Sequence, residues 1–361
     1  MNQIATDRLK ELIRSIEDPH TGRPLNDAVR GLAVHDDRVA VDICLAYPAA
    51  GWRDRLVELI RGRLRAIDGI DAVTVDVDWQ IPQHTVQGGL EPLAGVRNVI
   101  AVASGKGGVG KSTVSANLAL ALQAEGASVG VLDADVYGPS IPRMLGLSGR
   151  PETTDDRRIL PMPAHGLQAM SIGVLVETDQ AMIWRGPMAT QALQQMVSET
   201  KWQDLDYLII DLPPGTGDIQ LTLAQRIPVS GAVCVTTPQE VSVDDVRRAV
   251  AMFLKVKVPV LGVIENMSTH ICSSCGHEDA VFGSGGGERI AAESGVPLLG
   301  QVPLESGVGR STDEGNPIVV ADPDHPVAQR FREIARTVAG RLATQSRETK
   351  VKMPKIKIVD G

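Results

Sequence analysis

Aromatic residues are scarce in this chain of 361 residues, of which they make up 3%. The hydrophobic cores must therefore be built mainly from Val, Ile, Leu, Ala and Met, a composition typical of buried parallel sheets. No apolar run approaches the roughly 18 residues that a membrane-spanning helix needs, and no apolar segment follows Met1. We therefore expect neither membrane insertion nor export.

Positive charge and cysteine are also in short supply. The net charge is −8 and the isoelectric point is near 5.4, which argues against a nonspecific nucleic-acid binder. The four cysteines do not make a disulfide framework in a chain of this length. We expect a cytoplasmic protein, and in the reducing cytoplasm a close pair of cysteines is more often a metal or redox site.

Glycine is concentrated in one segment, GKGGVGKST, which fits the GxxxxGK[ST] pattern. In this pattern, backbone N–H groups and a helix N-terminus bind a polyphosphate. An apolar run at 98–103 and a segment of helical composition at 114–123 flank it as the motif requires. We expect Lys111 to reach the β- and γ-phosphates of ATP and Ser112 to ligate Mg²⁺. The nucleotide-binding residues are Gly105, Lys106, Gly107, Gly108, Val109, Gly110, Lys111, Ser112 and Thr113.

A second lysine, Lys106, stands at the start of the same loop in the pattern KGGxGKST. The loop thereby resembles the deviant Walker A ATPases, the group that contains MinD, ParA and the nitrogenase iron protein. The resemblance implies that Lys106 reaches across a homodimer interface to the nucleotide of the partner. Its catalytic role would then be that of an arginine finger, a cation supplied in trans to the transition state.

Hydrophobic patterns divide the chain near residue 90. Strand patterns at 38–45 and 72–79 and helical patterns at 7–16 and 53–67 predict a small α+β domain over residues 1–81. Glycine and proline mark residues 82–95 as a linker. From 96 to 345, short apolar strands alternate with helices, which predicts an α/β P-loop NTPase domain whose mostly parallel sheet is covered by helices on both faces. Residues 346–361 form a basic tail. The expected strands of the larger domain are 99–103, 128–132, 207–210, 232–236, 260–264 and 297–299.

Acidic residues end two of these strands. Asp133 and Asp135 follow the strand at 128–132, and Asp211 follows the strand at 207–210. Ligands of such sheets bind beyond the carboxyl ends of the strands, so these side chains are candidates to serve Mg²⁺ and the attacking water. We assign Asp135 to the water, Asp211 to the outer shell of the magnesium and Asp133 to support of that shell. The alternative is that such a carboxylate only caps the next helix.

Cys272 and Cys275 form a CxxC motif. Two thiolates at this spacing can converge on one metal ion or cluster iron, but they do not complete a tetrahedral site. Either His270 or His277 joins them, or a second chain contributes its own pair, as a two-fold dimer would. Ligand count leaves a shared [4Fe–4S] cluster and a Zn(Cys)₄ site open, and a redox pair is a third option. Cys234, inside an apolar strand, is expected to be a core residue.

Further motifs extend the resemblance to one family, Mrp/ApbC/Nbp35, over about residues 96–340. The N-terminal segment resembles the MIP18-like domain that bacterial Mrp proteins carry. The resemblance implies a homodimeric iron–sulfur cluster carrier that binds ATP, hydrolyses it slowly and transfers clusters to apoproteins, with scaffold proteins as further partners. It also implies a [4Fe–4S] cluster that bridges two subunits at Cys272 and Cys275, and an adenine contact from Asn266. The motifs are DLPPGTGD from Asp211, WRGPM from Trp184, TTPQ from Thr236, ENMS from Glu265 and FGxGGG from Phe282.

One departure from the family lies at Pro48, Ala49 and Ala50, where many MIP18-like domains have a cysteine after Pro-Ala. We therefore interpret the N-terminal domain as a docking or recognition module. Two other classes compete for the whole chain: a MinD- or ParA-type switch with a structural zinc, and an ATP-gated electron carrier of the nitrogenase type. A MinD-like protein should end in a basic amphipathic helix, which Pro354 would interrupt. Neither a membrane nor a nucleic acid is expected as a partner.

Overall fold

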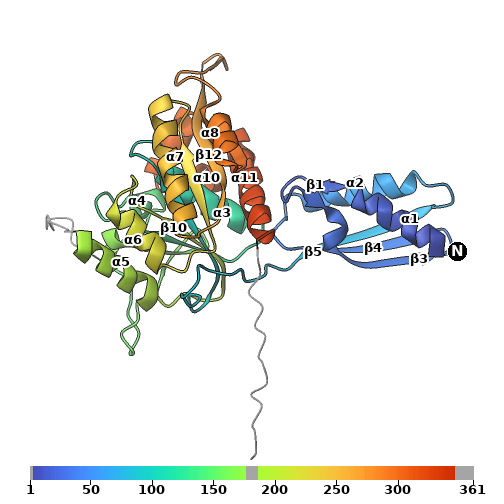
Figure 1. Ribbon diagram of the computed structural model, residues 1–361, viewed down its shortest axis with the longest axis horizontal. Helices are drawn as coiled ribbons and strands as arrows, with labels where there is room; N and C mark the ends of the chain where they lie inside the picture. The colour runs from blue at the N-terminus through green and yellow to red at the C-terminus, as the bar shows by residue number, and fades with distance from the viewer. Residues whose placement is uncertain (1–2, 176–185, 273, 346–361) are drawn as a thin grey trace, which may run out of the picture.

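The computed structural model describes residues 3–175, 186–272 and 274–345. Figure 1 shows a large body that contains a central sheet, and a smaller body formed by the N-terminal residues, which lies beside helix α11. The basic tail at 346–361, Ser273 and the first two residues of the WRGPM segment lie outside the described residues.

The N-terminal body is a three-stranded sheet with the order β3-β4-β5, in which β3 and β4 are antiparallel and β4 and β5 are parallel. Apolar residues alternate along β4, so that Val39, Val41 and Ile43 are buried on one face. The strands β4 and β5 were predicted with these bounds, whereas β3 and the short β1-β2 pair were not. The elements are α1 (Gln3–Arg14), β1 (Glu17–Asp18), β2 (Arg23–Pro24), η1 (Leu25–Ala28), β3 (Val29–His35), β4 (Arg38–Leu45), α2 (Arg53–Arg65) and β5 (Ala72–Trp79).

The large body contains a nine-stranded sheet with the order β13-β12-β11-β6-β10-β7-β9-β8, and β14 also pairs with β12. Its inner strands are parallel, and only β8 and β13 run antiparallel to their neighbours. The predicted mostly parallel sheet is therefore confirmed. The strands are β6 (Val96–Ser104), β7 (Val129–Asp133), β8 (Met162–Ala164), β9 (Leu167–Ser171), β10 (Leu205–Asp211), β11 (Gly231–Thr236), β12 (Val260–Ile271), β13 (Glu278–Asp279) and β14 (Leu298–Leu304).

Helices cover both faces of this sheet, as the continuous apolar strands require. Ile100 and Val102 of β6 pack into a core shared with α3 and α11, whereas Ala101 and Ala103 face a second core formed with α5, α6 and α7. The helices are α3 (Lys111–Ala124), α4 (Ile141–Met144), η2 (Ile172–Val174), α5 (Gly186–Glu199), α6 (Asp218–Arg226), α7 (Glu240–Lys255), α8 (Gly286–Ser294), α9 (Ser306–Asp313), α10 (Ile318–Ala321) and α11 (Pro326–Ala343).

The segment between the two bodies, residues 82–95, is attached to the base of the sheet. His84 is buried, and its backbone N–H donates to Asn98 Oδ1 over 3.1 Å. Gln87 donates to the carbonyls of Ala224 and Ile227 and accepts from the backbone of Val229. A linker of this kind holds the chain in one path, because leaving such buried polar groups without partners would cost free energy.

The two bodies meet at Glu125, the C-cap residue of α3. Its fully buried carboxylate accepts hydrogen bonds from Arg332 Nε over 2.7 Å and Arg336 Nη1 over 2.8 Å, both on α11. From the N-terminal body, the backbone N–H of Gly51 donates to the same carboxylate over 2.8 Å. A Cβ atom at Gly51 would lie 2.7 Å from Glu125 and from Arg332, so a larger residue here would displace the ends of these two side chains.

A second contact between the bodies involves His20. Arg336 Nε donates to His20 Nε2 over 3.3 Å, and burial, with the nearby Arg336 charge, lowers the pKa of His20 to about 3. His20 is therefore a neutral acceptor at physiological pH. A Cβ atom at Gly340 of α11 would lie 2.7 Å from the carbonyl oxygen of His20, which shows how closely the two backbones pack.

Within the three described ranges, no helix combines the length and the apolar character that crossing a membrane requires.

Candidate functional site

The glycine-rich loop lies between the end of β6 and the start of α3, at the carboxyl edge of the sheet. Gly108 and Gly110 have φ of +80° and +75°, a left-handed conformation that favours glycine. Gly110 is the N-cap of α3, so the N-terminus of a 14-residue helix opens at the loop. The loop lines a cavity of about 220 Å³ together with Asp135, Ser140 and Pro214.

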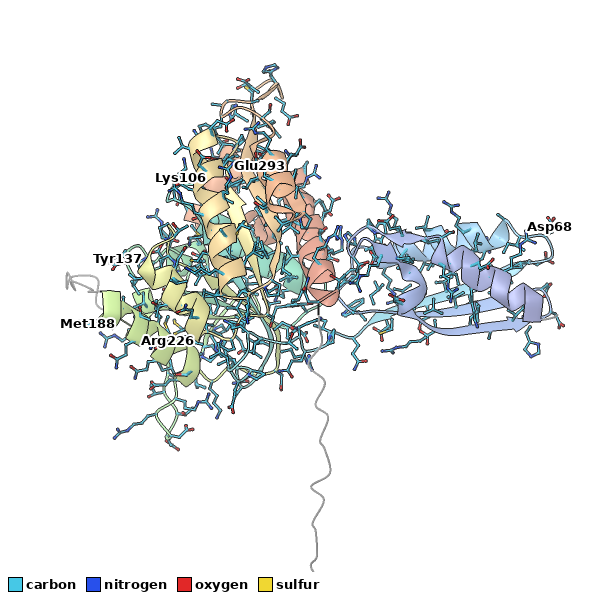
Figure 2. The ribbon with its side chains drawn as sticks, viewed as in Figure 1. Asp68, Lys106, Tyr137, Met188, Arg226 and Glu293 are labelled. Carbon is cyan, nitrogen blue, oxygen red and sulfur yellow. The ribbon has the colours of Figure 1, made fainter. Side chains whose placement is uncertain are left out.

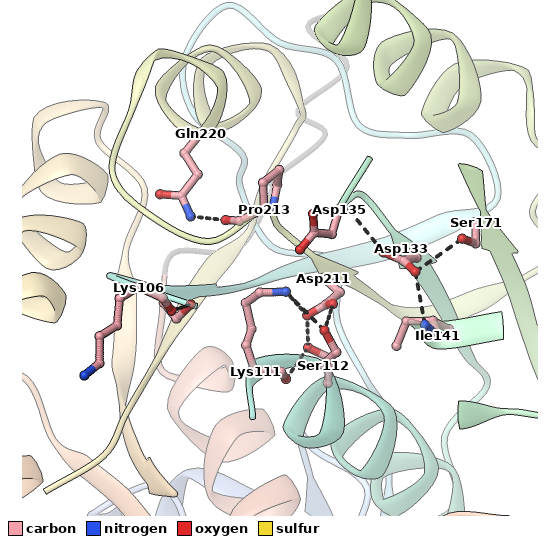
Figure 3. Close-up of polar contacts among 12 residues, drawn as sticks. Lys106, Lys111, Ser112, Asp133, Asp135, Ile141, Ser171, Asp211, Pro213 and Gln220 are labelled. Atoms are coloured by element: carbon pink, nitrogen blue, oxygen red, sulfur yellow. Dashed lines mark hydrogen bonds and ion pairs between the residues drawn. The ribbon is translucent and has the colours of Figure 1, made fainter. Parts of the chain in front are cut away.

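Lys111 and Asp211 form an ion pair inside this site (Figure 3). Lys111 Nζ lies 2.8 Å from Asp211 Oδ1, and the side chains are 6% and 0% exposed. Ser112 Oγ donates to Asp211 Oδ2 over 2.5 Å, and Ser115 Oγ donates to Oδ1 over 2.6 Å. The lysine that would bind phosphate and the hydroxyl that would bind Mg²⁺ are thus both held by the carboxylate at the end of β10.

Asp133 and Asp211 end neighbouring strands and are register partners. Asp133 is fully buried and accepts hydrogen bonds from the backbone N–H groups of Asp135 and Ile141 and from Ser171 Oγ. Burial raises the pKa of Asp133 to about 7, and the charge of Asp211 adds to the shift. Burial also raises the pKa of Asp135, which lines the cavity. The structure therefore brings all three predicted carboxylates to one edge of the sheet.

The side chain of Lys106 points in a different direction from that of Lys111. Its side chain points away from Lys111 and Asp211 (Figure 3), and its Nζ lies 3.3 Å from Gln239 Oε1. On the larger body, Lys106, Tyr137 and Met188 lie on the side away from the N-terminal body (Figure 2). Of two predicted catalytic lysines, one faces the carboxylates of its own chain and the other faces outward.

Asn266 contacts the phosphate-binding loop. It is 7% exposed, and its Nδ2 donates to the carbonyl oxygen of Val109 over 2.9 Å. Asn266 belongs to β12, which continues to Ile271 and ends immediately before Cys272. The sequence placed the end of this strand at residue 264, so the structure extends it by seven residues and carries the ENMS segment within it.

Cys272 and Cys275 lie in the turn between β12 and β13. Cys272 is half-buried and Cys275 exposed, and the Gly276 N–H donates to the Cys272 carbonyl over 2.8 Å. Hydrogen bonds from the backbone N–H groups of Ser274 and Cys275, and from the Cys275 side chain, lower the pKa of Cys272. Among the described residues, no three His, Cys, Asp or Glu side chains gather as metal ligands. Within the described part of the chain, the turn therefore offers two thiols, those of Cys272 and Cys275.

The other two cysteines lie apart from this turn. Cys234 is fully buried in β11, and burial raises the pKa of its thiol to about 12, as expected for a core residue. Cys44 is half-buried in β4 of the N-terminal body.

Several residues of the site were not predicted from the sequence. Ser115 donates to Asp211, and its position four residues after Lys111 on one helix face is a signal that could have identified it. Ser171 supports Asp133 from β9, a strand that was not predicted. Gln239, the partner of Lys106, is the last residue of the TTPQ motif, but nothing in the sequence linked it to Lys106.

A glycine-rich loop between a buried parallel strand and a helix, with its lysine and serine held by a carboxylate at the end of the neighbouring strand, defines a P-loop NTPase. Comparisons with known proteins agree with this class. The profile described as NUBPL iron-transfer P-loop NTPase matches residues 95–339. A second profile, described as iron-sulfur cluster assembly protein, matches residues 6–77. The chain belongs to the family of NUBPL-type iron-transfer P-loop NTPases.

Two relatives that match most of this chain share one description. The iron-sulfur cluster carrier protein of Haemophilus influenzae is 45% identical over 342 residues, which cover 94% of this chain and 92% of the relative. The protein of the same description from Escherichia coli is 48% identical over 326 residues, which cover 88% and 86%. The Mrp/ApbC/Nbp35 resemblance is thereby confirmed.

Solved structures support the same fold. The nucleotide-binding protein of Archaeoglobus fulgidus in complex with ADP is 36% identical, with a TM-score of 0.57 over 65% of this chain and 92% of that chain. The cell division ATPase MinD of Pyrococcus furiosus is 22% identical, with a TM-score of 0.51 over 67% and 98%. At 22% identity, the likeness to MinD supports the assignment of the fold and nothing more.

Proposed function

We propose that this protein is a homodimeric, ATP-hydrolysing carrier that binds an iron–sulfur cluster between two subunits and transfers it to apoproteins. The observation that carries the proposal is that β12 contacts the P-loop through Asn266 and leads directly into the turn that holds Cys272 and Cys275, in a chain whose relatives are described as iron-sulfur cluster carrier proteins. An electron carrier or a zinc-containing switch would share the P-loop, but the descriptions of the relatives do not favour either.

The site fits MgATP. The loop N–H groups and the N-terminus of α3 would bind the phosphates, and Lys111 would move its charge from Asp211 toward them. Ser112 Oγ and the carboxylates of Asp211 and Asp133 form an oxygen donor set of the kind that Mg²⁺ prefers. Mg²⁺ would neutralise charge on the transferred phosphoryl group. Asp135, which lines the cavity, would orient the attacking water, and Asn266 would contact the adenine.

Two features support a homodimer. The side chain of Lys106 points away from Lys111 and Asp211 of its own chain, as a lysine would that serves the nucleotide of a partner. Large apolar side chains are exposed on nearby elements: Tyr137 is 60% exposed, Met188 57% and Val241 66%. Exposed apolar residues of this size mark interaction surfaces when they gather on one side of a molecule.

Cluster binding is expected to depend on both thiols of the CxxC motif. After anaerobic reconstitution, the wild type should hold about four iron and four sulfide per dimer, whereas Cys272→Ala and Cys275→Ala should hold neither. Iron, sulfide and zinc are measured per dimer, together with the absorption spectrum. Cys44→Ala is the matched control, because Cys44 is a half-buried thiol in the N-terminal body, and it should reconstitute like the wild type.

Two outcomes would contradict the carrier proposal. Stable zinc without sulfide would make the CxxC motif a structural clamp and the protein an ATPase switch. A cluster that is loaded but never passed to an apo-ferredoxin, while it is oxidised and reduced with ATP turnover, would make the protein an electron carrier.

Lys106→Ala should separate nucleotide binding from hydrolysis. Binding of ATP should change little, because the Lys106 side chain points away from Lys111 and Asp211, which would hold the nucleotide and its Mg²⁺ in the same chain. The ATPase rate of the dimer should fall at least about tenfold, a part of what an arginine finger supplies. Titration with a fluorescent ATP analogue and a phosphate-release assay measure the two quantities. Hydrolysis at the wild-type rate would remove the trans role of Lys106.

A further inference from the structure

Strand β12 connects the phosphate-binding loop to the cysteine turn. Asn266, in the second half of the strand, donates to the carbonyl of Val109 in the loop over 2.9 Å. Five residues further on the strand ends at Ile271, and Cys272 follows. The backbone is continuous from Asn266 to Cys272. A displacement of the phosphate-binding loop that moves Asn266 can therefore reach the thiols without movement of another segment.

Asn266 and Met267 both rest on Gly110, the glycine that begins helix α3. A Cβ atom at Gly110 would lie 2.3 Å from Asn266 Nδ2 and 3.5 Å from Met267 Cε. Gly110 has φ of +75° and is the N-cap of the helix that starts with Lys111. The contact is therefore made at the glycine that begins helix α3, and a side chain there would displace the amide of Asn266.

Met267 has an unusual backbone for a residue with a side chain. Its φ is +55°, in the left-handed region, which is unfavourable for a residue other than glycine and persists only where the surroundings impose it. The pairing of β12 with β14 also shifts at this point. Asn266 pairs with Val302 and His270 with Leu304, so four residues of β12 span two of β14.

The two sides of this irregularity are held differently. Before it, Glu265 accepts from the Gly287 N–H over 2.6 Å and from Gln301 Nε2 over 2.8 Å, and β12 pairs on both sides with β11 and β14. After it, the strand pairs with β13, a two-residue strand of the same hairpin, and its one register pair with β14 is His270 with Leu304. The irregularity at Met267 thus separates a fixed half of β12 from a hairpin that carries the cysteines.

We propose that Asn266 and Met267, seated on Gly110, form a latch through which the phosphate-binding loop positions the hairpin that carries Cys272 and Cys275. The latch makes the reactivity of the two thiols depend on the nucleotide. This inference rests on the proposed function for the identity of the nucleotide as ATP and of the cargo as a cluster. A ligand shifts the equilibrium between two positions of the hairpin only to the extent that it binds one position more tightly than the other.

The latch can be tested on the cluster-free, full-length protein by thiol labelling. Cys272 and Cys275 are labelled with N-ethylmaleimide with and without saturating MgATP, and the modified peptides are quantified by mass spectrometry. Cys44, in the N-terminal body, is the internal reference. In the wild type, MgATP should change the labelling rate of the pair at least about fivefold relative to Cys44, the lower end of common coupling between two sites.

Two variants remove the latch in different ways. Asn266→Ala removes the hydrogen bond to Val109, and Met267→Gly removes the side chain on Gly110 while it relieves the left-handed backbone. In both, the nucleotide effect on labelling should fall to less than about twofold at saturating MgATP, below the usual range of coupling. Thr269→Ala is the matched control: it removes a 2.6 Å hydrogen bond to Glu278 within the hairpin but leaves the latch, so the nucleotide effect should stay.

The latch would be overturned if MgATP did not change the labelling rate of the pair in the wild type. It would also be overturned if both latch variants kept the full effect of MgATP on labelling. Saturation is checked by ATP titration of each variant, and the fold by circular dichroism. Iron and sulfide loading of the same proteins tests the proposed function separately. If the latch variants load a cluster but lose the nucleotide effect, the latch stands. If no protein loads a cluster while the labelling pattern holds, the carrier function fails and the latch stands.

Discussion

Lys111→Met is expected to reduce ATP hydrolysis by roughly 10²–10³-fold, the usual cost of removing one group that stabilises transition-state charge. Methionine keeps most of the unbranched apolar part of the lysine side chain but has no charged group to bind the phosphates. The ion pair between Lys111 Nζ and Asp211 Oδ1 is lost as well, at a position where both side chains are almost fully buried. The variant should therefore also be less stable, because a buried carboxylate without its counter-charge is costly. Phosphate release and thermal unfolding measure the two effects.

The two effects can be separated by a second substitution. Asp211→Asn in the Lys111→Met background removes the unpaired charge and leaves an amide that can still bond to Ser112 and Ser115. The double variant should recover much of the stability lost in Lys111→Met but none of the hydrolysis. If Lys111→Met hydrolysed ATP at the wild-type rate, the assignment of the P-loop lysine would be wrong.

Local patterns were enough to predict the elements that present the nucleotide site. β6, the loop and α3 follow from an apolar run, a glycine-rich motif and a helical segment, and each of the strands β7 and β10 ends at a predicted carboxylate. Buried strands of this kind can be predicted from the sequence because both of their faces are apolar. The apolar run is then visible whichever elements pack against the strand. The roles of the individual carboxylates and lysines stay predictions.

The elements that were missed depend on distant contacts. β8 contains a proline and is only three residues long, and β12 appeared to end early because the polar ENMS segment has the composition of a turn. The composition of residues 82–95 indicated a linker but gave no sign that His84 and Gln87 are buried against the base of the sheet. Secondary-structure propensity is a property of each residue type by itself. The structures of β8, of the second half of β12 and of residues 82–95 depend instead on tertiary contacts.

The junction of the two bodies is the clearest case of a contact without a sequence signal, because Glu125 unites Gly51 of the N-terminal body with Arg332 and Arg336 of α11. Glu125→Ala is expected to lower the free energy of unfolding by about 3 kcal/mol, the lower end of the cost of breaking a buried ion pair. The lower end applies because the arginine side chains keep some exposure, 19% and 11%.

Glu333→Ala is the matched control for this prediction. It lies on the same helix, α11, and its ion pair with Arg330 is about half exposed, so its loss should change the free energy of unfolding by less than about 1 kcal/mol. Urea denaturation measures both variants, and hydrogen exchange at residues 46–53 locates the effect. Glu125→Ala should raise exchange in that loop, because the Gly51 N–H loses its acceptor. Equal stability of the two variants would mean that the carboxylate of Glu125 does not hold the N-terminal body against the end of α3.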